Sequence, residues 1–122
     1  MTAYEPRLKL WLETDGQIVM SDYRVRLLEL ILESGSLASA AAAMELSYRR
    51  AWGKVKEIEE NIGFPLVESE VGGAGGGHTT LTPRAIALVR AYREFQEQAR
   101  TAVQQAFLRS FEEVAPIEKN AP

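Results

Sequence analysis

Residues 36–63 read SLASAAAAMELSYRRAWGKVKEIEENIG, and this stretch decides the fold. Ser36 is a good helix cap, and the alanine-rich run over residues 37–44 predicts a short helix that another helix can approach closely. After a two-residue break, Ser47 caps a second predicted helix, which Gly63 ends. Two short helices joined by a tight break are typical of a helix-turn-helix.

The second of these helices is cationic at its start. On a helical wheel its apolar residues gather on one side, which predicts a face toward the core. Residues 47–56 hold four basic side chains and no acidic one. In a helix-turn-helix the second helix enters the DNA major groove, where an arginine fork pairs with guanine O6 and N7. The candidate DNA-binding residues of the two helices are Ser36, Ser47, Tyr48, Arg49, Arg50, Trp52, Gly53, Lys54 and Lys56.

An ordinary solvated helix face is the alternative for these basic side chains. Tyr48 and Trp52 are, in the same way, more often packing residues than groups that stack on bases. Gly53 in the middle of a helix costs about 1 kcal/mol relative to alanine. On an exposed face that glycine would let the helix approach the groove closely. The alanine-rich helix before this segment and the glycine-rich loop after it favour the DNA interpretation.

The chain before the helix-turn-helix predicts a β-hairpin and one further helix. In residues 7–13 the leucines at positions 8, 10 and 12 fall on one face and Lys9, Trp11 and Glu13 on the other, which is the period of a strand. Asp15-Gly16 is a strong turn signal, and residues 17–20 can return as a second strand. Ser21 then caps a predicted helix over residues 23–33.

The chain after the helix-turn-helix predicts a second, glycine-rich hairpin. We expect strands over residues 64–68 and 79–81, with the segment VGGAGGGH between them. This segment is not followed directly by a helix, as a dinucleotide-binding loop would be, and it has no Gly-Lys-Thr or Gly-Lys-Ser, as a P-loop would have. We therefore reject nucleotide binding by this loop. Two strands with such a tip after a recognition helix form a wing, whose backbone N–H groups can meet phosphates. A tolerant surface loop is the alternative. The wing candidates are Gly73, Gly75, Gly76, Gly77 and His78, the last as a surface or phosphate-contacting group and not as a base.

Residues 84–113 predict a long helix that starts at a Thr82-Pro83 cap. About 30 residues span roughly 45 Å, more than the remaining chain can cover, so its apolar stripe predicts a homodimer on a palindromic site. The expected interface residues are Ile86, Val89, Tyr92, Ala99, Val103 and Phe107. The expected organisation is a winged helix-turn-helix over residues 1–81, its dimerisation helix over 82–114, and a disordered tail over 115–122.

Composition restricts the function classes. The chain has 122 residues, no cysteine and a single histidine, which suits one domain and offers no disulfide framework and no cysteine-ligated metal site. No segment approaches the ~20 apolar residues of a membrane span. We therefore expect a soluble, cytoplasmic, mainly α protein with a small β content, no catalytic site, no metal and no cofactor. The net charge of −3 is unusual for a DNA binder, but a binding face needs local and not global charge.

The motifs together resemble a known family. The runs SYRRAW at residues 47–52, GFPLVE at 63–68 and GGAGGG at 72–77 are similar to the N-terminal domain of ModE, the molybdate-responsive transcriptional regulator with a LysR-type winged helix-turn-helix. The resemblance implies a homodimeric regulator of molybdenum-uptake genes. Ala74 and Ser69 stand where members often place basic residues. The chain ends where the family's oxyanion-binding domains begin, so we expect no molybdate binding by this chain.

Two other functions compete with the dimeric regulator. A winged fold whose long helix binds another protein, with only weak DNA binding, agrees with the acidic net charge. A small oxyanion binder that uses the glycine loop would instead bind molybdate or tungstate directly. The sequence leaves the operator, the sign of regulation and the inducing signal open.

Overall fold

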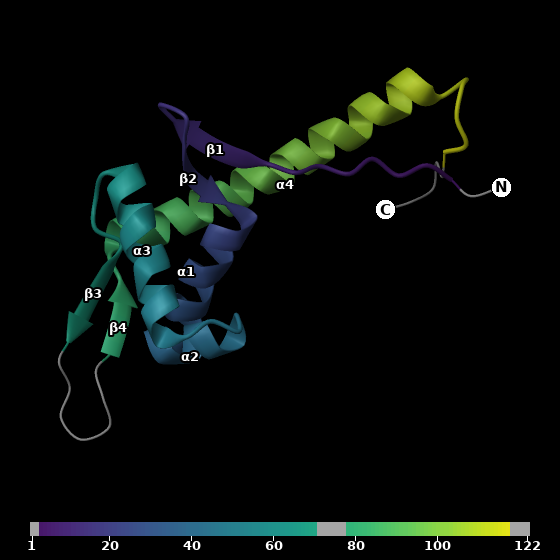
Figure 1. The fold of residues 1–122 in the computed structure, drawn as a ribbon. Coiled ribbons are helices and arrows are strands. Elements are labelled where there is room, and N and C mark those ends of the chain that lie inside the picture. The colour runs from purple at the N-terminus through teal and green to yellow at the C-terminus, as the bar shows by residue number, and fades with distance from the viewer. Residues whose placement is uncertain (1–2, 71–77, 118–122) are drawn as a thin grey trace. The chain divides into compact units, whose positions relative to one another are not determined.

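The computed structural model describes residues 3–70 and 78–117 (Figure 1). The elements follow the predicted order and confirm a mainly helical winged helix-turn-helix with small hairpins. They are β1 (Trp11–Thr14), β2 (Gln17–Ser21), α1 (Asp22–Ser34), α2 (Leu37–Ala43), α3 (Tyr48–Ile62), β3 (Val67–Glu70), β4 (His78–Leu81) and α4 (Pro83–Phe111). The chain divides into two compact units, Trp11–Tyr92 and a second unit made of Met1–Leu10 with Arg93–Pro122.

The first hairpin pairs β1 and β2 antiparallel around Asp15-Gly16, both of which have positive φ as the turn type requires. The prediction that its first strand begins at residue 7 was wrong, because β1 begins at Trp11. Trp11 pairs with Ser21, and the Ser21 hydroxyl accepts the Arg24 N–H at 3.2 Å to cap α1. The partner strand ends at Ser21, so the ladder of this hairpin ends at the Trp11–Ser21 pair.

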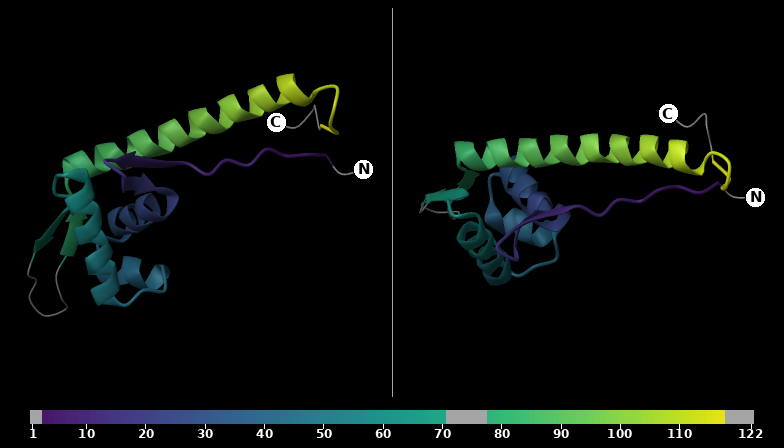
Figure 2. Two further views of the ribbon diagram at one scale, coloured as in Figure 1. Left: turned by 45° about the horizontal axis from the view of Figure 1, so that its top comes forward. Right: turned by 90° about the horizontal axis from the view of Figure 1, so that it is seen from above.

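The second hairpin pairs β3 and β4 antiparallel and lies beside α3 (Figure 2). Its first strand begins at Val67, so the prediction of a strand over residues 64–68 was placed too early. Pro65 has no N–H to donate, and the Leu66 N–H bonds to a side chain of α3 instead of a neighbouring strand. The Thr79 N–H donates to Gly35 O at 3.1 Å, which fastens β4 to the end of α1.

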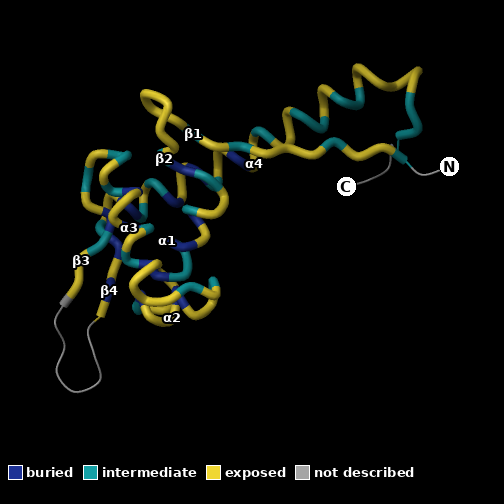
Figure 3. The backbone as a smooth tube through the Cα atoms, viewed as in Figure 1, coloured by how far each residue is buried: buried dark blue, intermediate teal, exposed yellow. Residues whose placement is uncertain are grey.

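The core of the Trp11–Tyr92 unit lies among the three short helices, the hairpins and the first turns of α4 (Figure 3). Gly35 and Gly63 end α1 and α3 in the left-handed conformation, with φ of 68° and 88°. The buried hydrophobic side chains are Met20, Val25, Leu27, Leu28, Ile31, Leu37, Ala40, Ala41, Ala51, Val55, Ile58, Leu66, Leu81, Ala85, Val89 and Tyr92.

The other unit contains residues 3–10 and the part of α4 from Arg93 onward. All views show the N-terminal segment running alongside this part of α4 (Figure 2), and the Tyr4 N–H donates to Pro116 O at 2.8 Å. α4 ends at Phe111, two residues earlier than predicted. Residues 115–117, the start of the expected tail, are half-buried, and residues 118–122 lie outside the described residues.

Candidate nucleic-acid interface

Side-chain caps set where the two helices of the helix-turn-helix begin. The Ser36 hydroxyl accepts the Ser39 N–H at 3.1 Å, and the Ser47 hydroxyl accepts the Arg50 N–H at 3.1 Å. The turn between them holds Glu45 at a φ of +57°, and the Leu46 N–H closes it by donating to an α2 carbonyl at 2.9 Å. The two serines predicted as site residues therefore use their hydroxyls to fix helix ends.

Small side chains bring α2 and α3 together. Ala40 and Ala41 of α2 and Ala51 of α3 are buried, and the two helices pack directly on each other. This contact fixes which face of α3 remains outside. The apolar side buries Val55 and Ile58, as the helical wheel predicts.

The exposed start of α3 presents an arginine pair. Arg49, Arg50 and Gly53 are exposed, and the Tyr48 side chain is 59% exposed. No hydrogen bond or ion pair links either guanidinium to another part of the chain that the structure describes. Both cations stand at a helix N-terminus, where free N–H groups and the helix dipole add positive potential. A Cβ at Gly53 would meet no atom within 4 Å, so this part of the helix surface is open.

The two lysines of α3 are held differently from the arginines. The Lys56 ammonium lies 4.6 Å from the centre of the Trp52 ring and 3.1 Å from a Glu59 carboxylate oxygen. Lys54 is half-buried, with its ammonium 6.0 Å from the Tyr23 ring centre. Trp52 itself is half-buried against the core. The four predicted basic residues thus form two pairs. Among the described residues, the side chains of Arg49 and Arg50 form no hydrogen bond or ion pair, whereas the ammonium groups of Lys54 and Lys56 lie near aromatic rings.

The wing is described in part. His78 is exposed at the first position of β4. The predicted residues Gly73, Gly75, Gly76 and Gly77 lie outside the described residues. The described strands hold the wing beside α3, with Val67 paired to Leu81 and Ser69 paired to Thr79.

The stripe predicted for dimerisation lies on both units. Val89 and Tyr92 are 5% and 2% exposed within the core, and Ile86 is partly buried against it. A single chain therefore already covers these side chains, so the expectation that the remaining chain is too small to cover this helix was wrong for its first turns. Ala99, Val103 and Phe107 are half-buried, and Phe107 stacks on Phe111 with ring centroids 5.0 Å apart. Phe95, which was not among the expected interface residues, is 46% exposed.

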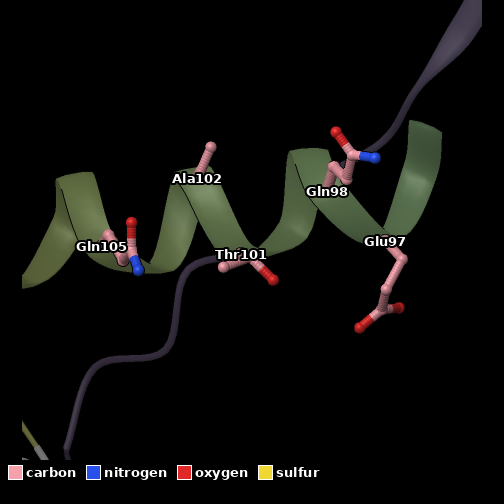
Figure 4. A pocket seen from close by; sticks show the side chains of 5 residues that line it. All are labelled: Glu97, Gln98, Thr101, Ala102 and Gln105. Carbon is pink, nitrogen blue, oxygen red and sulfur yellow. The ribbon is translucent and has the colours of Figure 1, made fainter. Parts of the chain in front are cut away.

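A pocket of about 280 Å³ lies on the same helix (Figure 4). Its lining residues, all on α4 and all exposed, are Glu97, Gln98, Thr101, Ala102 and Gln105. None of them is cationic, and Glu97 is an acid, so this pocket is unsuited to an oxyanion. In residues 3–70 and 78–117, no group of three or more His, Cys, Asp or Glu residues could hold a metal ion. The helices in the same residues all lack the combined length and hydrophobicity that a membrane span needs.

Taken together, the capped helix pair, the exposed arginines and the adjoining hairpin define a winged helix-turn-helix DNA-binding domain. The sequence profile described as "bacterial regulatory helix-turn-helix protein, lysR family" matches residues 23–86. The chain belongs to this family. The matched family is one of bacterial regulatory helix-turn-helix proteins, not of enzymes.

The similar proteins carry regulator and molybdenum names. "Molybdenum transport protein ModE" of Azotobacter vinelandii is 36% identical over 103 residues, which cover 84% of this chain and 38% of that protein. "Transcriptional regulator ModE" of Haemophilus influenzae is 39% identical over 69 residues, covering 57% and 27%. "DNA-binding transcriptional dual regulator ModE" of Escherichia coli K12 is 31% identical over 88 residues, covering 72% and 34%. The chain thus spans well under half the length of these relatives.

A solved structure supports the fold. The DNA-binding domain in "Crystal structure of CbnR_DBD-DNA complex" superimposes with a TM-score of 0.54 at 21% identity, covering 71% of this chain and 94% of that one. At this identity the likeness establishes the shared fold.

Proposed function

We propose that this chain binds double-stranded DNA in a sequence-specific manner and regulates transcription, with α3 as its recognition helix. The observation that carries the proposal is the unengaged pair Arg49 and Arg50 at the capped start of the second helix of a helix-turn-helix. A bidentate arginine–guanine contact contributes about 1–3 kcal/mol of discrimination against a wrong base. Tyr48 and the open surface at Gly53 lie beside this pair and would complete the base-facing surface.

The remaining contacts are expected to go to the DNA backbone. The start of α2 at Ser36 can face a phosphate, because helix N-termini favour anions. The wing, with residues 73–77 and His78, is expected to follow the adjacent phosphates or the minor groove. Lys54 and Lys56 would contribute long-range attraction, since their ammonium groups already rest on rings.

We further propose that two copies associate through α4, so that residues 1–81 read DNA, residues 82–114 dimerise and residues 115–122 form a tail. Val89 and Tyr92 are used by the core, so the second copy would meet the later part of the helix. Phe95 offers the most exposed large hydrophobic side chain in that part of α4, and Ala99, Val103 and Phe107 are half-buried. Two-fold symmetry would present two α3 helices to a palindrome with half-sites about 34 Å apart.

The regulated genes are proposed to serve molybdenum uptake in the cytoplasm of the source cell. Support comes from the names of the relatives, which describe molybdenum transport and transcriptional regulation. We propose that this chain does not bind molybdate. A calorimetric titration with molybdate tests this proposal, because a measurable heat of binding would contradict it.

Selection from a random duplex library followed by fluorescence anisotropy tests the DNA proposal. The full chain should recover a palindromic motif, and log K should fall linearly with log salt, by about 0.9 for each phosphate contacted. Arg49→Ala with Arg50→Ala should abolish the preference for the motif. Arg7→Ala is the matched control, because Arg7 is an exposed arginine outside the interface.

Three results would contradict the proposal. The first is the absence of any enriched motif at low salt. The second is an equal loss of affinity in the Arg7→Ala control. The third is equal, weak binding to all duplexes, which would favour a winged-helix module that binds another protein. A monomer in sedimentation at all protein concentrations would refute the dimer without touching the recognition helix.

A further inference from the structure

Glu59 joins the recognition helix to the wing. It lies in the acidic second half of α3, and its side chain is 14% exposed. One carboxylate oxygen, Oε2, accepts the backbone N–H of Leu66 at 2.8 Å and that of Val67 at 3.4 Å. The other, Oε1, lies 3.1 Å from the Lys56 ammonium. Both oxygens of one carboxylate are therefore engaged, one by the start of the wing and one by the helix.

The peptide groups around Leu66 are held from two sides. The Leu66 N–H donates to Glu59 of α3, and the Leu66 carbonyl accepts the Thr82 N–H at 2.9 Å. Thr82 follows β4 and caps α4, with its hydroxyl donating to Pro65 O at 3.0 Å and accepting the Ala85 N–H at 3.1 Å. The base of the wing is thus fixed between α3 and the start of α4. Leu66 itself is fully buried, so the joint is anchored in the core.

We propose that Glu59 is a positioning residue that sets the wing relative to the base-facing surface of α3. This inference rests on the proposed DNA binding. A hydrogen bond to a charged acceptor is about twice as strong as a neutral one, and it has a defined direction. The link between Gly63 and Val67 contains no other side-chain bond to α3 among the described residues. Among the described residues, Glu59 therefore makes the side-chain hydrogen bonds that hold the first residue pair of the wing, Val67 and Leu81, beside α3, in addition to the contacts of Thr82 and the buried Leu66.

The direction in which DNA affinity changes when Glu59 is replaced distinguishes a positioning role from a purely electrostatic one. Removing an acid from a helix that faces a polyanion should strengthen DNA binding or leave it unchanged. Removing the joint should weaken binding, because the wing and α3 must contact one duplex at the same time. Glu60 provides the matched control, since it is the next residue on the same helix, carries the same charge and is exposed.

Amide hydrogen exchange of the full chain tests the joint without DNA. In Glu59→Ala the Leu66 amide should exchange about 10–100-fold faster, relative to the Val55 amide as a reference for global opening. Glu59→Gln, whose amide oxygen still accepts a hydrogen bond, should restore most of the protection. Glu60→Ala should match the unchanged chain. Full protection of Leu66 in Glu59→Ala would overturn the inference.

Anisotropy with the selected duplex tests the positioning role, at a temperature where every variant is folded. Glu59→Ala should bind roughly tenfold more weakly, a loss of about one base or phosphate contact. Glu60→Ala should bind as well as the unchanged chain or better, and Glu59→Gln should recover most of the affinity. Equal binding by Glu59→Ala and Glu60→Ala would overturn the positioning role. If the unchanged chain bound no duplex, the proposed function would fail instead, and the exchange result would still decide whether Glu59 holds the strand.

Discussion

Tyr92 and Phe95 are aromatic residues three positions apart on α4, yet truncating them should change stability by very different amounts. Tyr92 is 2% exposed in the core, whereas Phe95 is 46% exposed. Replacing a buried aromatic side chain with alanine costs about 3–5 kcal/mol through lost burial and the cavity left behind. Phe95→Ala should lose about 1 kcal/mol of burial. Alanine's higher helix propensity returns about 0.5 kcal/mol in both variants. The expected difference is therefore at least about 2 kcal/mol.

Urea unfolding followed by circular dichroism measures this difference. With a slope of about 1–3 kcal/mol per molar urea, Tyr92→Ala should lower the midpoint by roughly 2 M. Measurements at two protein concentrations, about 50-fold apart, add the second readout, because a dimer's midpoint rises with concentration. Phe95→Ala should lose that dependence while keeping most of the stability. Equal stability losses in the two variants would refute the placement of Tyr92 in the core and of Phe95 at the surface between copies.

Local changes near the interface give further expectations. Arg49→Ala should lose about 1–3 kcal/mol of binding to the selected duplex by anisotropy; Lys56→Ala should lose much less, and equal losses would contradict the division between them. Glu45→Gly should raise the unfolding free energy in urea by about 0.5–1 kcal/mol, because it removes a left-handed non-glycine residue, and destabilisation would argue against that backbone. Gly63→Ala should cost about 1–2 kcal/mol in the same assay for the converse reason, and no cost would contradict its positive φ. Ser47→Ala should cost about 1 kcal/mol, and a neutral result would argue against the cap.

The helices of the helix-turn-helix were predictable because their signals are local. Ser21, Ser36 and Ser47 each accept a backbone N–H three residues ahead, as their place before an apolar run predicts. The glycines after α1 and α3 end these helices in the conformation that glycine favours. The start and the end of each of these helices depend only on nearby residues, so they can be predicted from a single sequence.

The strand ends and the partners of side chains were not predictable in the same way. β1 begins at Trp11 because its partner strand ends at Ser21, where the chain continues into α1. The sequence pattern of residues 7–13 gives no information on where that partner strand ends. The periodicity of α4 identified Val89 and Tyr92 as apolar but not the core that covers them. Likewise, the charge of Lys56 was evident, whereas its contact with the Trp52 ring depends on side-chain direction. In each of these cases the prediction depended on a contact partner that only the three-dimensional structure identifies.

The charge pattern of α3 follows from two different demands on one helix. Its second half uses acids to fasten neighbours, with Glu59 bound to the start of the wing and Glu57 3.8 Å from the Arg24 guanidinium beside the first hairpin. Those acids would repel DNA if they stood at the start of the helix, where the dipole instead favours an anionic ligand. Within residues 3–70 and 78–117, no acidic side chain forms an ion pair with Arg49 or Arg50 there. A chain with a net charge of −3 can therefore present a cationic surface, because the acids of α3 lie in its second half, where Glu59 and Glu57 contact neighbouring elements.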